Sequence, residues 1–383
     1  MVSKNPQGVK STAEPSPNWD SNSPLYGVVM AVQANYYRVK VEHPAHGNQT
    51  SEHEKLSSFL LCTRRTRLKK TGQKVMVGDR VMVEEPDWQS DRGAIGAVLP
   101  RATELHRPPI ANASQILLVF ALAEPTLDPW QLSRFLVQAE STNLQLCLCL
   151  NKSDLILGEQ QEQWQRRLAG WGYSANFVSV SQDYQLEQLI QRLQGKITVV
   201  AGPSGVGKSS LIDRLIPQVK LRVGAVSGKL QRGRHTTRHV ELFELPGGGL
   251  LADTPGFNQP DLNCEPSSLD RYFPEIRARL KDQRCQFNNC LHRDEPGCVV
   301  RGNWERYEYY LDFLEQAIAY AAQLQQQPEP ESNLKLVVKR SGKSQYEPKL
   351  ETKKYRRPSR KTRQQNWQDI YENQLADEIE DLF

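Results

Sequence analysis

The chain has 383 residues, of which 38% are hydrophobic and 24% charged, and its 49 Lys and Arg against 44 Asp and Glu leave a formal net charge of +5. This length exceeds what one compact core usually supports, so we expect two or three domains of ordinary globular composition. No stretch has the apolar length of a membrane span or signal peptide, which argues against a membrane protein and predicts a cytoplasmic one without membrane partners.

The N-terminal part of the chain predicts a disordered segment followed by a small β-barrel. Residues 1–23 are polar and contain several Pro, Ser and Asn residues, and residues 24–104 form short alternating runs broken by turn residues. A basic stretch, Arg64–Lys70, favours an OB-fold, whose face commonly binds nucleic acid, over another small barrel with a solvated basic loop. The runs that predict strands are Gly27–Met30, Tyr36–Val41, Phe59–Cys62, Val75–Val77 and Gly78–Val83.

Residues 105–262 change to apolar strands that alternate with helical stretches, which predicts a parallel α/β sheet. Strands are expected at Ile116–Phe120, Leu144–Leu150 and Ile197–Ala201, with a helix through Leu132 and Ala139 between the first two. Residues 263–325 follow as a helical segment around a cysteine cluster, and residues 326–383 are polar and low in aliphatic residues. We expect a zinc-binding domain and then a disordered tail.

The segment Gly202–Ser209 matches the phosphate-binding pattern G-x-x-x-x-G-K-[ST] without a mismatch. An apolar strand precedes it and Ser210 opens a helix, so backbone N–H groups and the helix N-terminus can hold phosphates. Lys208 is expected to reach the β- and γ-phosphates and Ser209 to bind Mg²⁺. A tight glycine turn alone would not explain the lysine.

The segment Asn151–Asp154 directly follows an apolar run and predicts the residues that recognise the base. An aspartate carboxylate only accepts hydrogen bonds, so it suits the two donors on the guanine edge, which adenine lacks. The same four residues could instead start a capped helix. In a chain with a phosphate-binding loop we favour guanine recognition. The expected GTP contacts are Asn151, Lys152, Ser153, Asp154, Gly202, Pro203, Ser204, Gly205, Val206, Gly207, Lys208, Ser209 and Ser210.

A second phosphate-facing segment, Asp253–Gly256, follows the apolar run Leu250–Ala252. Its Asp is expected near the Mg²⁺ shell and its Gly amide near the γ-phosphate. Thr236 or Thr237 would complete that shell only when the γ-phosphate is present, and the sequence does not separate the two. The residues expected to act in hydrolysis are Lys208, Thr236, Thr237, Asp253 and Gly256.

The order of these motifs indicates a circularly permuted GTPase, because the guanine motif precedes the phosphate-binding loop, whereas it comes last in Ras-like chains. Phe257 stands where Ras-type enzymes have the Gln that orients the attacking water, so we expect slow intrinsic hydrolysis. Arg234 or His235 could act there, although a phosphate or partner contact fits each better.

Cys285, Cys290, His292 and Cys298 supply three thiols and one imidazole within fourteen residues. This donor set favours one structural Zn²⁺ ion with tetrahedral ligands and no open position. The other cysteines, Cys62, Cys147, Cys149 and Cys264, lie mostly in apolar runs and are interpreted as core residues.

With these motifs the chain resembles the ribosome small subunit-dependent GTPase A family (RsgA, also called YjeQ) over roughly residues 24–320. The resemblance rests on the permuted motif order and on five segments, which are Val77–Val81, Arg107–Asn112, Gly233–Thr237, Asp253–Phe257 and the Cys285–Cys298 cluster. It implies an OB-fold, a permuted GTPase domain and a zinc domain. It also implies a late maturation factor of the 30S subunit that binds 16S rRNA, with subunit-stimulated GTPase activity, and we expect a monomer.

The tail and two rival functions remain open at this stage. Between Lys335 and Arg363 lie twelve Lys and Arg residues against two Glu, with Tyr346 and Tyr355 interleaved, and an acidic stretch follows. Such a segment can bind RNA, or it can simply be solvated. The rivals are a non-enzymatic RNA-binding scaffold and a small-molecule kinase, but no acceptor-substrate motif accompanies the phosphate-binding loop.

Overall fold

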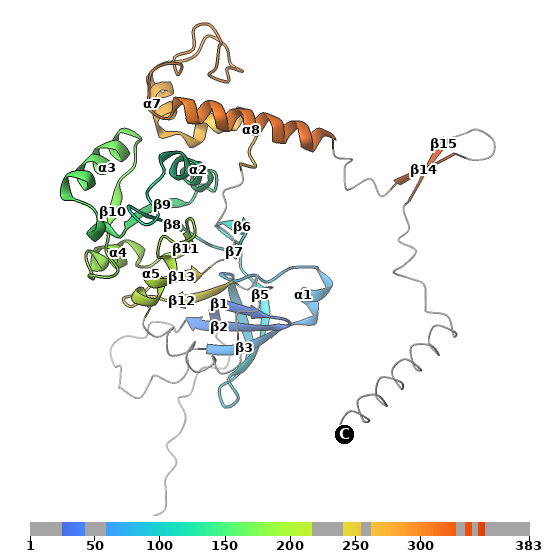
Figure 1. Ribbon diagram of the computed structural model, residues 1–383. Coiled ribbons are helices and arrows are strands. Elements are labelled where there is room, and N and C mark those ends of the chain that lie inside the picture. Colours follow the sequence, from blue (N-terminus) through green and yellow to red (C-terminus); the bar gives the residue numbers. More distant parts are fainter. Residues whose placement is uncertain are drawn as a thin grey trace, which may run out of the picture. The chain divides into compact units, whose positions relative to one another are not determined.

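The computed structural model describes residues 25–42, 59–216, 240–253, 262–326, 334–338 and 344–348 (Figure 1). The chain divides into two units, Met1–Tyr320 and Ala321–Phe383. Within the described ranges, no helix is both long and apolar enough to cross a membrane.

Five strands of the first unit close into the predicted OB-fold barrel. They follow the cyclic order β1-β2-β3-β5-β4-β1, in which only the β3–β5 pair is parallel. Alternate residues of each strand point inward, and Val29, Val39, Leu60, Val81 and Ile95 are fully buried in one core. The strands are β1 (Leu25–Gln33), β2 (Tyr36–Glu42), β3 (Phe59–Arg64), β4 (Arg80–Asp87) and β5 (Arg92–Val98).

Two details of the barrel differ from the sequence prediction. Val75–Val77 forms no strand and contributes only an isolated bridge from Val77 to Ile110, whereas β5 was not predicted. The basic stretch is partly helical, because α1 (Thr66–Lys70) caps the core with Leu68. Two glycines, Gly93 and Gly96, interrupt the alternation of β5, and their lack of a side chain hides the strand pattern.

The barrel is joined to the next domain through the turn at Gly78 and Asp79. Gly78 has φ of 87°, and a Cβ there would lie 2.1 Å from the carbonyl oxygen of Ala111, so only glycine permits this close approach. The Asp79 carboxylate is fully buried and accepts two hydrogen bonds from Arg101, at 2.7 and 2.9 Å. Asn112 donates to the Gly78 carbonyl at 3.0 Å. Two of the segments that carry the family resemblance therefore contact each other. The short strands β6 (Glu104–His106) and β7 (Pro109–Ala111) flank this joint.

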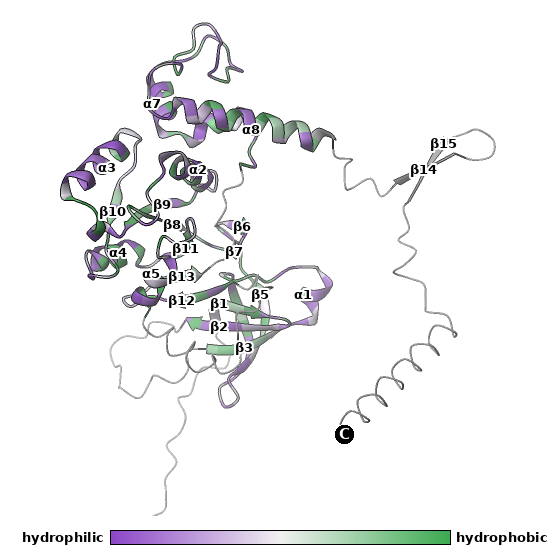
Figure 2. Cartoon of the chain, viewed as in Figure 1, coloured by the Kyte–Doolittle hydropathy of each residue, from purple (hydrophilic) through white to green (hydrophobic). Residues whose placement is uncertain are grey.

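The second domain is built on the predicted parallel sheet. Its order is β10-β9-β8-β11-β13-β12, with every pair parallel except β13–β12. β8 is buried along its whole length, and Figure 2 shows β8 and β9 as hydrophobic and α3 as largely hydrophilic. The elements are β8 (Gln115–Ala121), α2 (Pro129–Glu140), β9 (Gln145–Asn151), η1 (Ser153–Leu155), α3 (Gly158–Gly170), β10 (Ala175–Phe177), α4 (Leu186–Leu193), β11 (Ile197–Ala201), α5 (Lys208–Leu215), β12 (Glu241–Glu244) and β13 (Leu250–Asp253).

The barrel and this sheet share a single run of hydrogen-bonded strands. Strand β1 pairs antiparallel with β12 at Ala31 and Glu241, and Met30 joins Val240 and Leu242 in one hydrophobic core. Lys40 of β2 also forms an ion pair with Glu244, at 2.8 Å. The strand that precedes β13 is therefore held by the barrel.

A helical segment completes the first unit. It contains η2 (Pro266–Tyr272), α7 (Pro274–Asp282) and the start of α8 (Tyr307–Gln326). Its core of Leu269, Phe273, Ile276 and Phe313 also includes Val137 from α2. In the tail, β14 (Leu334–Val338) pairs antiparallel with β15 (Ser344–Pro348), so the expectation of no regular structure after residue 325 does not hold for these residues.

Candidate functional site

The guanine motif and the phosphate-binding loop lie at the same edge of the sheet. Asn151 ends β9 and Gly202 follows β11, and both strands run parallel to β8, which lies between them. The carboxyl ends of parallel strands meet at one edge, where open α/β sheets bind their ligands. Residues fifty positions apart in the chain are therefore brought together by the sheet.

A direct hydrogen bond joins the two motifs. The buried Asn151 side chain donates from Nδ2 to the Val206 carbonyl at 2.9 Å, and its Oδ1 accepts from the Val180 N–H at 3.4 Å. Gly207 has φ of 93°, and a Cβ there would lie 2.4 Å from Asn151 Nδ2. A side chain at position 207 would thus push the guanine motif and the phosphate loop apart.

The carboxylate expected to recognise the base is exposed and held by hydroxyl groups. The Ser181 hydroxyl donates to Asp154 Oδ2 at 3.1 Å. Hydrogen bonds from Ser179 and Ser181 lower the pKa of the Asp154 carboxyl, so it is ionised at neutral pH. An ionised carboxylate only accepts hydrogen bonds, as recognition of the guanine N1–H and 2-amino group requires.

Lys152 and Ser153 set the shape of the same turn. Lys152 adopts the left-handed conformation with φ of 59°, and its Nζ donates to the Glu124 carbonyl of the loop after β8. Ser153 is buried and its N–H donates to the Val178 carbonyl at 3.1 Å. The turn is therefore held by hydrogen bonds to two neighbouring loops. The Asp154 side chain is left exposed, away from the core.

The phosphate-binding loop turns sharply between β11 and α5. Gly202 has φ of 136°, and a Cβ there would lie 2.1 Å from the Val119 carbonyl oxygen of β8. Lys208 Nζ donates to the carbonyls of Gly202 and Pro203 at 2.8 and 2.5 Å, so the ammonium group lies over the loop. Ser204 and Gly205 are exposed at the turn, as are Ser209 and Ser210 on the first turn of α5. This leaves the loop accessible to a phosphate group.

The remaining expected site residues are described only in part. Thr236, Thr237 and Gly256 lie outside the described residues. Asp253 ends β13, which runs parallel to β11, so its backbone reaches the same edge as Gly202.

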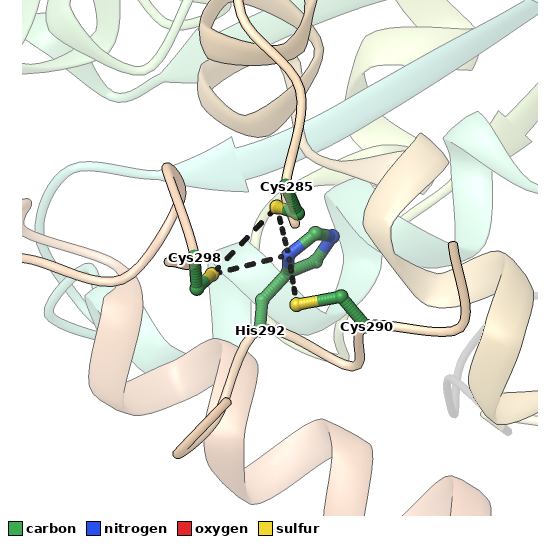
Figure 3. A group of neighbouring side chains, drawn as sticks. All are labelled: Cys285, Cys290, His292 and Cys298. Atoms are coloured by element: carbon green, nitrogen blue, oxygen red, sulfur yellow. Dashed lines mark hydrogen bonds between the residues drawn. The ribbon is translucent and has the colours of Figure 1, made fainter. Parts of the chain in front are cut away.

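The cluster of three cysteines and one histidine is assembled (Figure 3). His292 Nδ1 lies 3.6 Å from Cys285 Sγ and 3.5 Å from both Cys290 Sγ and Cys298 Sγ, and the sulfurs of Cys285 and Cys298 are 3.9 Å apart. Ligands of a tetrahedral ion with bonds of about 2.3 Å to sulfur and about 2.1 Å to nitrogen would be separated by about 3.5 to 3.8 Å. The observed distances fit this geometry, so the group can hold one metal ion.

The surroundings of the cluster also fit a metal site. His292 Nε2 lies 3.8 Å from Asp270 Oδ2, on the side away from the sulfurs, which is where a carboxylate orients a metal-bound imidazole. Burial raises the pKa of the Cys290 thiol to about 12, so a thiolate there needs a neighbouring cation. Glu295 accepts from the Leu291 and Arg293 N–H groups, both at 2.8 Å, and fixes the loop between the ligands.

Several contacts that shape these sites were not found from the sequence. Asn151 donates to the backbone carbonyl of Val206, and Lys152 donates to that of Glu124. Every residue has a backbone carbonyl, so no sequence pattern identifies these two partners. The structure also adds the Val180 N–H, which donates to Asn151, and the Ser181 hydroxyl, which donates to Asp154. Asp270 lies twenty-two positions before His292, too far for a spacing pattern to connect them.

Comparisons with known proteins agree with this arrangement. The family model described as RsgA GTPase matches residues 98–263. A protein of Trichormus variabilis named small ribosomal subunit biogenesis GTPase RsgA is 62% identical over 361 residues, which cover 91% of this chain and 98% of that protein. The protein of that name from Synechocystis is 52% identical over 375 residues, covering 93% and 97%.

Two solved structures have the same architecture. The crystal structure of YloQ, described as a circularly permuted GTPase, matches with a TM-score of 0.64 at 29% identity and covers 79% of this chain and 98% of that one. YjeQ from Thermotoga maritima matches with a TM-score of 0.62 at 29% identity, covering 77% and 99%.

Proposed function

The chain belongs to the RsgA GTPase family, and from this premise we propose that it hydrolyses GTP in the biogenesis of the small ribosomal subunit. The relatives that carry this name match it over nearly their whole length. One contact supports the nucleotide assignment most directly, which is the 2.9 Å hydrogen bond from Asn151 to Val206. It fixes the guanine-recognising motif against the phosphate-binding loop, as a site that binds both ends of GTP requires.

Each motif of the nucleotide site has a separate task in this proposal. Asp154 accepts from the guanine edge, and the backbone N–H groups from Gly202 to Ser209 hold the phosphates. Lys208 leaves the loop carbonyls to contact the β- and γ-phosphates. Ser209 binds Mg²⁺, which neutralises phosphate charge, together with Asp253 and Thr236 or Thr237, while Gly256 contacts the γ-phosphate.

The metal of the Cys-His cluster is zinc in this proposal. Three sulfur donors and one nitrogen donor at tetrahedral spacing favour zinc, in a site with no coordination position left open for water or substrate. One ion per chain stabilises the fold and takes no part in hydrolysis.

The partner in this proposal is the 30S subunit, contacted through its 16S rRNA by a monomer of the cytoplasm. Basic and aromatic side chains meet on the barrel, where the Arg38 guanidinium lies 4.2 Å from the centroid of the Phe59 ring and Tyr36 is exposed. Such surfaces combine phosphate contacts with base stacking.

The proposal is tested by GTP turnover with and without purified 30S subunits. Slow turnover that rises with added subunits, with ATP unable to replace GTP, is the expected result. Equal turnover of ATP would contradict the guanine assignment. Nucleotide binding without turnover under any condition would favour the scaffold instead.

A further inference from the structure

A cavity of about 410 Å³ lies between the C-terminal end of α3 and the helical segment that carries the metal cluster. Its walls include Arg166 and Trp171 at the end of α3, Arg279 of α7, and Trp304 just before α8. Helix α3 has 13 residues and is about 20 Å long; its N-terminal turn contacts the guanine motif through Gln161, which donates to the Ser153 carbonyl, whereas the cavity lies at its C-terminal end. The cavity is therefore separate from the nucleotide site.

The walls of this cavity are held by hydrogen bonds of the two tryptophans and by a buried ion pair. The Trp171 indole N–H donates to Glu305 Oε2 at 2.8 Å, and the Trp304 indole N–H donates to the Val300 carbonyl at 3.0 Å. Behind them the fully buried Arg306 forms two hydrogen bonds to Glu275, at 2.7 and 2.5 Å. A ligand would meet a preformed surface and would not have to order these side chains.

The cavity carries a surplus of positive charge. Arg306 balances Glu275, so only Glu305 offsets the lining arginines, and it already pairs with Arg167. Arg166 donates to the Glu162 carbonyl at 3.4 Å and Arg279 to the Glu275 carbonyl at 3.1 Å. Within the described part of the chain, neither of these two guanidinium groups has a carboxylate at ion-pair distance. Both retain donors for an incoming anion.

We propose that this cavity binds one unpaired nucleotide of an RNA, with its phosphate on Arg166 and Arg279. Guanidinium groups bind phosphate through two parallel hydrogen bonds, and bases stack on tryptophan and arginine planes. Trp304 offers such a surface, with the Arg279 guanidinium 5.3 Å from its ring centroid. The inference rests on the proposed ribosomal function for the source of the RNA.

The lining of the cavity favours a nucleotide over an acidic peptide. A base carries amino groups that can donate to Glu305 and a ring that can stack on Trp304, whereas the carboxylate side chain of an acidic peptide offers neither. The volume also suits one nucleotide, because pockets for small organic ligands begin at about 300 Å³.

Chemical protection tests the site in the full chain. The metal-loaded protein with bound GDP is treated with phenylglyoxal, which modifies arginine, with and without a single-stranded RNA oligonucleotide of mixed sequence. Mass spectrometry should show protection of Arg166 and Arg279 by RNA and unchanged reaction of Arg192, an exposed arginine of α4 outside the cavity. Equal reaction of Arg166 and Arg279 at saturating RNA would overturn the proposal, as would full protection by inorganic phosphate alone.

Substitution provides the second readout. The double variant Arg166→Gln with Arg279→Gln should weaken RNA binding about tenfold. The slope of log affinity against log salt concentration should become shallower by about one for each lost phosphate contact. Arg192→Gln is the matched control and should behave as the wild type. Metal content and GDP affinity should stay unchanged in all variants. Wild-type RNA affinity and slope in the double variant would refute the site, whatever the result of the 30S-stimulated GTPase assay.

Discussion

The metal cluster and the nucleotide site are assembled in opposite ways. All four candidate ligands of the cluster come from the fourteen residues Cys285–Cys298, and their side chains meet within one loop. The nucleotide site joins Asn151 to Val206 across 55 positions, and it depends on strands β8, β9 and β11 lying side by side. A local cluster needs its metal to keep a shape, whereas a site built on a sheet is shaped by the core beneath it. A substitution that disrupts one of the two sites should therefore leave binding at the other unchanged.

The largest effect is expected from Cys290→Ser, which removes one ligand from a site whose metal contributes about 10 to 16 kcal/mol in small zinc domains. Metal analysis should fall from about one ion per chain to nearly none, and amide exchange should rise between Cys285 and Arg306. The affinity for GDP should stay within about twofold, because distant sites act additively.

Cys264→Ser is the control for this change, because Cys264 is partly buried against the core of the same helical segment but is not among the four Cys and His residues of the cluster. It should keep the metal. A metal-free Cys290→Ser protein with unchanged exchange would show that the cluster does not depend on its ion.

The buried ion pair inside the helical segment, between Arg306 and Glu275, gives the next largest effect. Glu275→Gln would leave Arg306 charged, fully buried and without its carboxylate, which costs about 3 to 5 kcal/mol when a buried pair loses one partner. Urea unfolding followed by tryptophan fluorescence measures this loss. Asp183→Asn breaks the exposed pair with Arg214 and should cost less than about 1 kcal/mol. Equal costs for the two changes would contradict a buried connection.

Asp154→Asn changes selectivity without changing the fold. Loss of an ionised acceptor for two guanine donors should reduce the preference for GDP over ADP by about 2 to 4 kcal/mol, which is roughly 30- to 700-fold. Competition binding with GDP, ADP and XDP measures it, and metal content should remain at the wild-type level. Because the pKa of Asp154 is already lowered, the wild type should keep its preference for GDP at mildly acidic pH. An unchanged preference in the variant would refute the placement of the base.

The smallest effect is expected from the tail. Truncation after Gln325 removes the basic stretch and should lower the salt slope of RNA binding, by about 0.7 to 0.9 for each lost phosphate contact. Truncation after Arg363 is the matched control, because it removes only the acidic end. If both truncations keep the wild-type slope, the basic stretch does not bind RNA.

The sequence was sufficient for the elements that chemistry specifies locally. Gly202–Ser209 and the Cys285–Cys298 cluster each carry a pattern that is specific for one kind of site, whereas Asn151–Asp154 becomes specific only in a chain that also has a phosphate-binding loop. The arrangement between elements was not predictable in this way. Arginine is rarely buried, so nothing in the sequence marked Arg306 as the fully buried partner of Glu275, and the pairing of β1 with β12 arises from packing between domains.

The glycines show why the rest was missed. Gly93 and Gly96 have no side chain, so the alternation of buried and exposed residues that marks a strand is not visible in β5. A larger residue at position 207 would clash with Asn151, which is evident only once Asn151 is in place. Such close approaches become visible only when the second segment is in place.

The most direct test measures the affinity of the protein for purified 30S subunits, once with GDP bound and once with a non-hydrolysable GTP analogue bound. A nucleotide site that acts as a switch should change this affinity by about 5- to 150-fold, the range of about 1 to 3 kcal/mol found for linked sites. The measurement is made on the truncation after Gln325, so that tail contacts insensitive to nucleotide do not mask the difference. The account predicts a clear dependence on nucleotide that Lys208→Ala abolishes, and equal affinities in the two nucleotides would contradict it.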